Sequence, residues 1–194
     1  MIKFTIVTIT YNAADVFMRT ADSVARQTYA AVEHLIIDGA SSDGTQNMAE
    51  EYKKASDAAC NGHEVRIISE PDKGLYDAMN KGRRLATGDY VCFLNAGDFF
   101  PSADTLDVIA ANARLEECSS KGKPLPGVLY GDTDWVDNDG NYMSRRRLTP
   151  PEKLTWRSFR HGMLVCHQAF YARTDLAQKV PYDLRYRFSA DVDW

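Results

Sequence analysis

The amino-acid sequence lacks the features that mark several large classes of proteins. No apolar run in its 194 residues approaches the ~20 residues that span a bilayer, and no secretory signal precedes Ile2. Its net charge of −4 provides no overall cationic field for a nucleic acid or an acidic membrane. We therefore expect one soluble domain in the cytoplasm that binds no nucleic acid.

Cysteine and histidine are scarce and badly spaced for a metal site. The four cysteines lie at positions 60, 92, 118 and 166, and the four histidines show no i, i+4 pair. A disulfide framework is not expected in a chain of this size without a secretory signal. The thiols are therefore expected to be free, in a reducing compartment.

Glycine-rich phosphate-binding motifs are also missing. The first strand-to-helix turn is Thr10-Tyr11-Asn12-Ala13, which fits neither a dinucleotide fingerprint nor a P-loop. A dinucleotide-dependent oxidoreductase is therefore the least favoured class. A sugar nucleotidyltransferase would need a glycine-rich and basic signature near the first strand, and none is there. Any nucleotide must be held by side chains, or by aromatic or backbone contacts other than a glycine cradle.

Strand and helix patterns alternate through the first half of the chain. Strands are predicted over 3–10, 34–37, 65–68 and 90–94, and helices over 12–27, 45–58, 75–86 and 102–117, with Asn12 as the first helix cap. This alternation predicts an α/β fold, in which a mostly parallel sheet is covered by helices on both faces.

The pattern changes after residue 118. A surface linker leads to a hairpin predicted over 128–143 that turns at 138–140, a helix that begins at Pro150-Pro151, and an apolar strand over 163–171. We expect residues 1–118 to form one half of the domain, and 119–194 to form a smaller mixed or antiparallel half that covers one side of a cleft.

Polar clusters follow each predicted strand, where parallel sheets bind their ligands. Asp38 ends an apolar strand and could accept a hydrogen bond from an N–H of a nucleobase. Ser42 or Asp43 beside it could simply cap the next helix. Asp98 could bind a divalent metal that is held between diphosphate oxygens, or could lie in a plain turn into the next helix. Asp191 could be a general base or part of an acidic helix start.

Two further groups have a plain and a functional interpretation. His167 lies in the predicted apolar strand beside Gln168 and could be a core histidine or a pocket residue. Arg145-Arg146-Arg147 could be a solvated face, or could contact phosphate or an anionic lipid surface.

Together these motifs resemble the family-2 glycosyltransferases, which have the GT-A fold. The resemblance rests on Ile6–Asn12 (IVTITYN), Ile36–Thr45 (IIDGASSDGT), Ser69–Gly82 (SEPDKGLYDAMNKG), Ala86–Asp98 (ATGDYVCFLNAGD), Cys166-His167-Gln168 and Ser189-Ala190-Asp191. It implies a nucleotide-sugar donor, most often a UDP-sugar, along the sheet's carboxyl edge. The donor-site residues it implies are Thr10, Tyr11, Asn12, Asp38, Ser41, Glu70, Lys73, Asp77, Asn95, His167 and Gln168.

The sequence departs from the family's Asp-x-Asp motif. The resemblance places that motif on Asn95 to Asp98, where only Asp98 is acidic and is left to meet Mn²⁺ or Mg²⁺. The Leu-Asn-Ala-Gly-Asp form is similar to enzymes of bacterial surface-polysaccharide synthesis, including the colanic-acid type. A glycan or a lipid-linked acceptor is implied, with peripheral contact at the inner face of the membrane.

The resemblance also implies a mechanism. Asp191 would take the proton from an acceptor hydroxyl, and one-step displacement would invert the anomeric centre. The alternative is a degenerate, non-catalytic domain that binds nucleotide or sugar, which the missing acidic positions around Asn95 favour and the intact Asp98 and Asp191 oppose. Family members generally continue beyond the Asp191 motif, so we expect this chain to be a fragment with weak transfer activity.

Overall fold

Residues 1–190 are described by a computed structural model, in which six strands form one sheet in the order β3-β2-β1-β4-β8-β5. The four N-terminal strands run parallel, and β8 is antiparallel to β4 and β5 on either side of it. The predicted α/β fold with a mostly parallel sheet is confirmed. The strands are β1 (Phe4–Thr10), β2 (Val32–Asp38), β3 (His63–Ser69), β4 (Tyr90–Phe93), β5 (Val128–Tyr130) and β8 (Phe170–Arg173).

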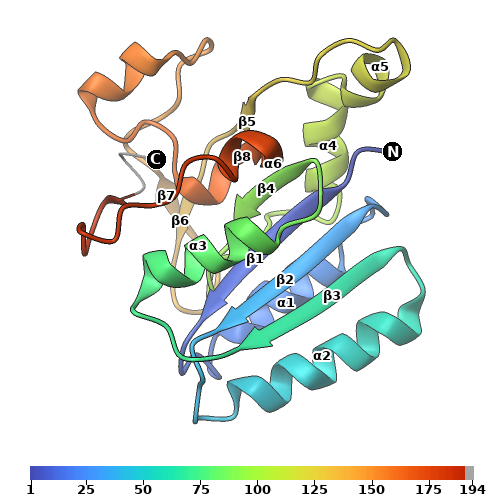
Figure 1. Cartoon of the computed structure of the whole chain (residues 1–194), viewed down its shortest axis with the longest axis vertical. Coiled ribbons are helices and arrows are strands. Elements are labelled where there is room, and N and C mark those ends of the chain that lie inside the picture. Colours follow the sequence, from blue (N-terminus) through green and yellow to red (C-terminus); the bar gives the residue numbers. More distant parts are fainter. Residues whose placement is uncertain (191–194) are drawn as a thin grey trace.

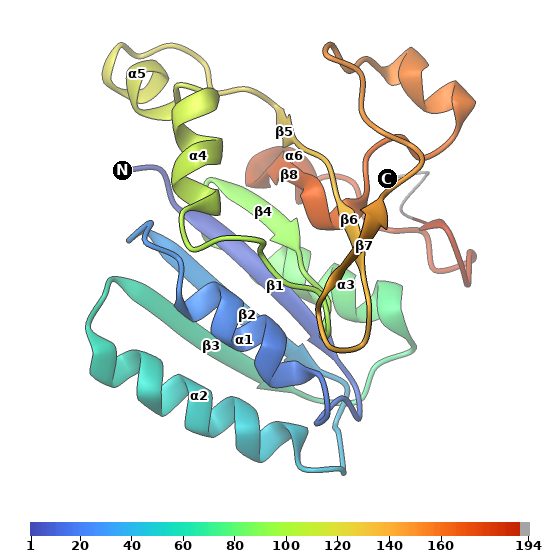
Figure 2. The same cartoon turned by 180° about the vertical axis from the view of Figure 1, so that it is seen from behind.

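Helices cover both faces of this sheet (Figures 1 and 2). One face carries α1 (Phe17–Ala25), α2 (Thr45–Ala59) and α4 (Thr105–Asn112), and the other carries α3 (Leu75–Leu85) and α6 (Thr174–Ala177). The two faces are built from alternate residues of the same strand. In β1, Phe4 and Ile6 pack in the core toward α1 and α4, whereas Val7 and Ile9 pack in the core toward α3 and α6.

The remaining elements are short. Strands β6 (Asp134–Val136) and β7 (Tyr142–Arg145) form a separate antiparallel hairpin. Helix α5 (Leu115–Ser120) follows α4, and two 3₁₀ helices, η1 (Trp156–His161) and η2 (His167–Ala169), precede β8. No helix within residues 1–190 is long and apolar enough to cross a membrane.

Several predicted boundaries are wrong. The helix predicted over 102–117 is two helices, because Arg114 adopts a left-handed φ of 50° between α4 and α5. Residues 128–130 leave the predicted hairpin and pair with β8 in the main sheet, where Leu129 is buried. The strand predicted over 163–171 begins only at Phe170, and the helix predicted at Pro150-Pro151 is the 3₁₀ helix η1.

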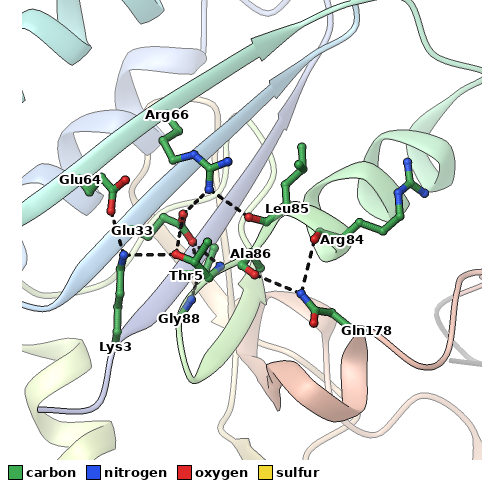
Figure 3. A network of polar contacts seen from close by, with 11 residues as sticks. Lys3, Thr5, Glu33, Glu64, Arg66, Arg84, Leu85, Ala86, Gly88 and Gln178 are labelled. Atoms are coloured by element: carbon green, nitrogen blue, oxygen red, sulfur yellow. Dashed lines mark hydrogen bonds and ion pairs between the residues drawn. The ribbon is translucent and has the colours of Figure 1, made fainter.

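A buried carboxylate closes the amino edge of the sheet (Figure 3). Glu33 is 0% exposed and accepts hydrogen bonds from Thr5 Oγ1 at 2.5 Å, Arg66 Nη1 at 2.6 Å, and Thr87 N and Oγ1 at 2.8 and 3.0 Å. Burial raises the pKa of Glu33, but the bonds from Thr5, Thr87 and Arg66 outweigh burial and hold this pKa below its usual value. The ionised carboxylate therefore ties β1, β2, β3 and the entry to β4 together.

His34, the next residue of β2, points to the opposite face of the sheet and is also buried. Its ring contacts Thr8 Oγ1 at 2.9 Å and Tyr52 OH at 2.8 Å. Complete burial lowers the pKa of His34 to about 3, so the ring is neutral at pH 7. His34 is a core histidine that ties α2 to the sheet.

Candidate functional site

The carboxyl edge of the sheet brings together the loops that follow β1, β2, β3 and β4. Backbone bonds carry the strand pairing beyond the strand ends. Gly39 N donates to Thr10 O at 2.9 Å, Glu70 N to Asp38 O at 3.0 Å, and Ala96 N to Ile9 O at 3.1 Å. The four loops are therefore held next to one another at one edge, and most of the predicted site residues lie in them.

Asp38 organises the loop after β2. Its carboxylate is 0% exposed and accepts four hydrogen bonds, from Ser41 N at 3.0 Å, Ser41 Oγ, Gln46 Nε2 at 3.1 Å and Ser69 Oγ at 2.6 Å. All of these donors are neutral. The contact between Asp38 and a nucleobase stays a prediction, and Gln46 is a partner that the sequence did not indicate.

Asn12 does not cap a helix, which corrects the sequence prediction. It adopts a left-handed φ of 49°, and α1 begins five residues later at Phe17. Asn12 N donates to Ser41 Oγ at 2.8 Å, and its Oδ1 accepts from Ser42 N at 2.9 Å. Asn12 therefore joins the loop after β1 to the loop after β2. Asparagine reaches the left-handed region more easily than most residues, which suits it to this position.

Asp43 fastens the same two loops together. Its Oδ1 accepts from Thr45 N at 3.0 Å and Thr45 Oγ1 at 2.6 Å, and its Oδ2 accepts from Ala14 N at 2.9 Å. The Thr45 hydroxyl is the main cause that lowers the pKa of the Asp43 carboxyl. The carboxylate thus holds the turn before α2, but the N-cap residue of this helix is Gly44 rather than Ser42 or Asp43, which corrects the helix-cap interpretation.

Tyr11, Gly39 and Asp72 converge at the mouth of this edge. The Tyr11 side chain is 66% exposed. A Cβ at position 39 would lie 2.8 Å from Asp72 Oδ2 and 3.1 Å from Tyr11 Cδ2, so only glycine fits there without a shift. Asp72 was not among the predicted site residues. Three residues from three different loops therefore lie next to one another at this edge.

Glu70 and Lys73 lie on the loop between β3 and α3, and Asp77 lies in the first turn of α3. Lys81 Nζ lies 3.1 Å from Glu70 Oε1 and 2.8 Å from Pro71 O, so a nearly buried lysine supports this loop from α3. Asp77 Oδ2 accepts from Lys73 N at 3.0 Å at the start of α3, where a helix favours an acidic side chain. The structure places two of the predicted residues on this loop and the third in the first turn of α3, and Lys81 is an addition.

The turn of Asn95 to Asp98, the 95–98 turn, follows β4. Asp98 N donates to Asn95 O at 3.0 Å, and Gly97 has a φ of 102° at the position where such a turn requires glycine. The Thr20 hydroxyl, on α1, accepts a hydrogen bond from Gly97 N and donates one to Asp98 O in this turn. The carboxylate of Asp98 is thus carried on a short, hydrogen-bonded turn at the ligand edge.

The second half of the chain reaches this turn through η2. His167 Nε2 lies 3.1 Å from Asn95 Nδ2, and Gln168 Nε2 donates to Asp98 Oδ2 at 2.8 Å. The Cys166 thiol donates to Gln168 Oε1 at 2.6 Å, which fixes the Gln168 amide with its nitrogen toward Asp98. His167 lies in a 3₁₀ turn rather than in the predicted strand. This turn aims His167 and Gln168 at the end of β4.

The donor atoms at this edge suit a metal that is held mostly by a substrate. Within residues 1–190, no three histidine, cysteine, aspartate or glutamate side chains gather into a metal cage. Asp98 alone presents a carboxylate on the 95–98 turn. Mg²⁺ and Mn²⁺ in nucleotide sites take one or two carboxylates and complete their coordination with phosphate and water oxygens. The residues therefore fit a metal bound together with a diphosphate.

Two polar atoms at this edge are buried without a hydrogen-bond partner among the described residues. They are Thr10 Oγ1, at the end of β1, and Asn95 Oδ1, at the end of β4. Buried polar atoms are rarely left unpaired in folded proteins. Their position at the carboxyl ends of neighbouring strands marks the place where a polar ligand would meet the sheet.

Asp191 and the three arginines at 145–147 are the remaining predicted groups. Asp191 falls outside the described residues. Of the three arginines, Arg146 is engaged internally, since its guanidinium donates to Leu148 O, Met163 O and Leu164 O, whereas Arg145 and Arg147 are exposed. Arg145 also pairs with Asp132 at 3.1 Å.

Known proteins are similar to this chain in sequence and in fold. The profile of a family described as "Glycosyl transferase family 2" matches residues 5–177. A "PGL/p-HBAD biosynthesis glycosyltransferase" of Mycobacterium tuberculosis is 35% identical over 192 residues, which are 98% of this chain and 67% of that protein. The "uncharacterized glycosyltransferase YibD" of Escherichia coli K12 is 32% identical over 154 residues, which cover 69% of this chain and 43% of YibD.

Solved structures with low sequence identity share the fold. Residues 1–349 of TarS from S. aureus, in complex with UDP, match 98% of this chain with a TM-score of 0.73 and 19% identity. The mannosyltransferase PcManGT from Pyrobaculum calidifontis, in complex with GDP-Man and Mn²⁺, matches 94% of this chain with a TM-score of 0.59 and 19% identity. The chain spans 53% of the TarS chain and 48% of the PcManGT chain.

Proposed function

Since the chain belongs to glycosyl transferase family 2, we propose that it transfers a sugar from a nucleotide-diphospho-sugar, in the first place a UDP-sugar, to a hydroxyl group. The acceptor is a glycan or a lipid-linked molecule of bacterial surface-polysaccharide synthesis. The observation that carries this proposal is the gathering of four loops, two unpartnered buried oxygens and the Asp98 carboxylate at one edge of the sheet.

The donor nucleotide lies along the loops after β1, β2 and β3 in this proposal. Tyr11 and Thr10 border the base. Asp38 contributes to binding the base either by a direct hydrogen bond or by holding the loop after β2 in place. Glu70, Lys73 and Asp77 line the nucleoside side. TarS structures are described with UDP and with UDP-GlcNAc, and PcManGT with GDP-Man, which supports a nucleotide-sugar donor.

Asp98 is the residue that would hold a divalent cation, Mn²⁺ or Mg²⁺, beside the diphosphate. When bound, such a cation offsets the negative charge that builds on the departing diphosphate. The mention of Mn²⁺ in the PcManGT complex supports metal use in this fold. Gln168 orients the Asp98 carboxylate, and Asn95 offers its unpartnered Oδ1 to a ligand hydroxyl.

The reaction is a single displacement. The acceptor oxygen forms a bond to the anomeric carbon, the bond from that carbon to the diphosphate breaks, and the acceptor proton passes to Asp191. Attack on the face opposite the diphosphate inverts the anomeric centre, and general-base help contributes typically 10²–10⁴ in rate. Asp191→Asn is expected to abolish transfer and to leave nucleotide binding near normal. Retained turnover would contradict the assignment of the base.

The acceptor side also offers a surface for peripheral contact with the inner face of the membrane. Residues 143–163 hold six basic side chains and one acidic one in a chain whose net charge is −4. Arg145 and Arg147 are exposed there, close to the exposed Trp135, Tyr142 and Met143 of the β6–β7 hairpin. Basic and aromatic side chains together suit an anionic lipid surface. Loss of vesicle binding in an Arg145→Glu, Arg147→Glu variant tests this contact.

The rival function is a non-catalytic domain that binds nucleotide or sugar, which the single acidic residue of the 95–98 turn favours. A thermal-shift panel of UDP, GDP and CDP, with and without Mn²⁺, tests the shared part of both proposals. We expect UDP to raise Tm most and Mn²⁺ to enlarge the shift. Release of free UDP from a UDP-sugar then separates the enzyme from the binding domain. No shift with any nucleotide would contradict both.

A further inference from the structure

Helix α1 presents a stripe of polar side chains to the segment that follows β4. Thr20, Ser23 and Gln27 are spaced three and four residues apart, so they lie on one face of the helix and its C-terminal extension. They are 0%, 6% and 4% exposed. Buried polar groups on a helix face must find partners, and here each of the three has at least one partner within residues 95–106.

The far end of this stripe anchors the entry to α4. Gln27 Nε2 donates to Ser102 O at 2.7 Å, and Gln27 Oε1 accepts from Leu106 N at 3.1 Å. Ser23 Oγ accepts from Phe100 N at 3.2 Å and donates to Thr20 O at 2.8 Å. These contacts fix backbone that lies beyond the 95–98 turn.

Thr20 alone in the stripe bonds the 95–98 turn itself. Its hydroxyl accepts from Gly97 N at 2.9 Å and donates to Asp98 O at 2.6 Å, and Asn95 O lies 3.3 Å away. One hydroxyl offers one proton and two lone pairs, so both of the shorter contacts form at once. The backbone of Asp98 is therefore attached to α1.

The Asp98 carboxylate is held from the other side. Gln168 binds the Asp98 side chain from η2, whereas Thr20 binds the Asp98 main chain from α1. Asp98 is the only acidic residue of the 95–98 turn, so in the proposed site it supplies the turn's carboxylate to the metal. The direction of this carboxylate depends on both attachments. Residues that orient a ligand are commonly worth 10–100-fold in metal affinity.

We propose that Thr20 is a positioning residue for metal-assisted nucleotide binding: its hydroxyl holds the 95–98 turn so that Asp98 faces the diphosphate. This inference rests on the proposed function. Thr20 touches neither nucleotide nor metal and acts through the backbone of Gly97 and Asp98. Loss of the hydroxyl frees that backbone, so the carboxylate loses its fixed direction although it is still present.

The test measures UDP affinity by titration calorimetry, with and without Mn²⁺, in wild type and in Thr20→Val. Valine keeps the shape of threonine and removes the hydroxyl. We expect the factor by which Mn²⁺ tightens UDP binding to fall about tenfold, while metal-free UDP affinity changes less than twofold. Thr20→Ser keeps the hydroxyl and should restore the factor. Thr20→Ala is the second variant if Thr20→Val does not fold.

Ser23→Ala is the matched control, since it removes a buried hydroxyl one turn further along the same helix face. It should lower Tm, as Thr20→Val does, and leave the Mn²⁺ factor unchanged. An independent reading in the metal-free protein is hydrogen exchange at Gly97, whose amide should lose protection in Thr20→Val. An unchanged Mn²⁺ factor in folded Thr20→Val, or an equal loss in Ser23→Ala, would overturn the inference.

The outcome for wild type separates this inference from the proposed function. If wild type binds no nucleotide, or if Mn²⁺ does not tighten UDP in wild type, the proposed metal-assisted function fails and the inference fails with it. If wild type shows the Mn²⁺ effect and Thr20→Val keeps all of it, only the positioning role of Thr20 is wrong.

Discussion

The two ends of β2 each bury a carboxylate, yet their surroundings differ. Glu33 and Asp38 are both 0% exposed, and each accepts four hydrogen bonds. Glu33 has a guanidinium among its partners, Arg66 at 2.6 Å, whereas the donors to Asp38 are backbone, hydroxyl and amide groups. One charge is matched by a cation, and the other is satisfied only by dipoles.

This difference separates stability from ligand binding along a single strand. A buried charge that is paired with a cation mainly locks the chain that it touches. A charge that is held by neutral donors keeps its electrostatic field, which attracts a ligand's donor groups or cation. The unpartnered Thr10 Oγ1 and Asn95 Oδ1 lie at the same edge as Asp38. The amino edge therefore stabilises the sheet, and the proposed ligand site lies at the carboxyl edge.

The strongest way to break the amino edge is Glu33→Ala. This substitution removes the carboxylate partner of Arg66 and four hydrogen bonds. We therefore expect the free energy of unfolding to fall by about 3 kcal/mol, which is the low end for a broken buried ion pair because Arg66 is partly exposed. Urea unfolding measures this loss, and UDP affinity should stay unchanged in the folded protein. Glu64→Ala, which breaks the exposed pair with Lys3, is the control and should cost under about 0.5 kcal/mol.

The opposite result is expected for Asp98→Ala at the carboxyl edge. The tightening of UDP by Mn²⁺ should vanish, while the free energy of unfolding changes by less than about 0.5 kcal/mol, since Asp98 is a partly exposed group on a turn. Calorimetry of UDP with and without Mn²⁺ measures the first quantity, and urea unfolding measures the second. Asp104→Ala, in the loop before α4, should leave both quantities unchanged. A persistent Mn²⁺ effect would move the metal ligand elsewhere.

Asp38→Asn tests whether the two buried carboxylates differ as described. The amide cannot accept all four hydrogen bonds, so stability should fall by about 1–2 kcal/mol, less than for Glu33→Ala. UDP affinity should fall about tenfold, which Glu33→Ala does not produce. The comparison of the two edges would be wrong if both variants lost stability alike and neither lost affinity.

The effect that appears only when the pH is lowered lies between the two carboxylates, at His34. Its pKa is about 3 in the folded protein against 6.5 unfolded, so the unfolded chain binds more protons below pH 6.5. Stability is therefore fully present above pH 6.5 and is lost as pH falls toward 3, by at most about 1.4 kcal/mol per pH unit. His34→Gln should flatten the slope of unfolding free energy between pH 6.5 and 5. A slope that persists in this variant would assign it to another group.

The sequence predicts the first half of the fold well because its elements are defined locally. The apolar run from Leu35 to Ile37 and the helical spacing of Phe17, Ala21 and Val24 identify buried elements without knowledge of their partners. The second half depends on distant pairing. Val128–Tyr130 becomes a strand of the main sheet only because Phe170–Ala172 lies beside it, and no local pattern reports that contact.

The candidate site follows the same rule. Asp38, Tyr11 and Asp98 could be found because polar residues at strand ends form a recognisable pattern. Gln46, Lys81 and Thr20 could not, since each acts on a loop that only the fold brings near to it. Asn12 was assigned to the wrong role because an asparagine before a helix is also a common cap, and its left-handed backbone is invisible in the sequence.

The reversed direction of β8 has a consequence for how such a chain can diversify. Strand β5 ends and β8 begins at the ligand edge, where Gly131 N donates to Ala169 O at 3.0 Å. Residues 132–168 thus form a segment that leaves the sheet and returns to it at one point, where the hydrogen bond between Gly131 and Ala169 holds its two ends together. The length and content of residues 132–165 can change while this hydrogen bond, the contacts of residues 166–168 with the 95–98 turn and the four parallel strands stay in place. Under the proposed function, exchange of this one segment would change the acceptor side while the loops proposed for the donor stay in place.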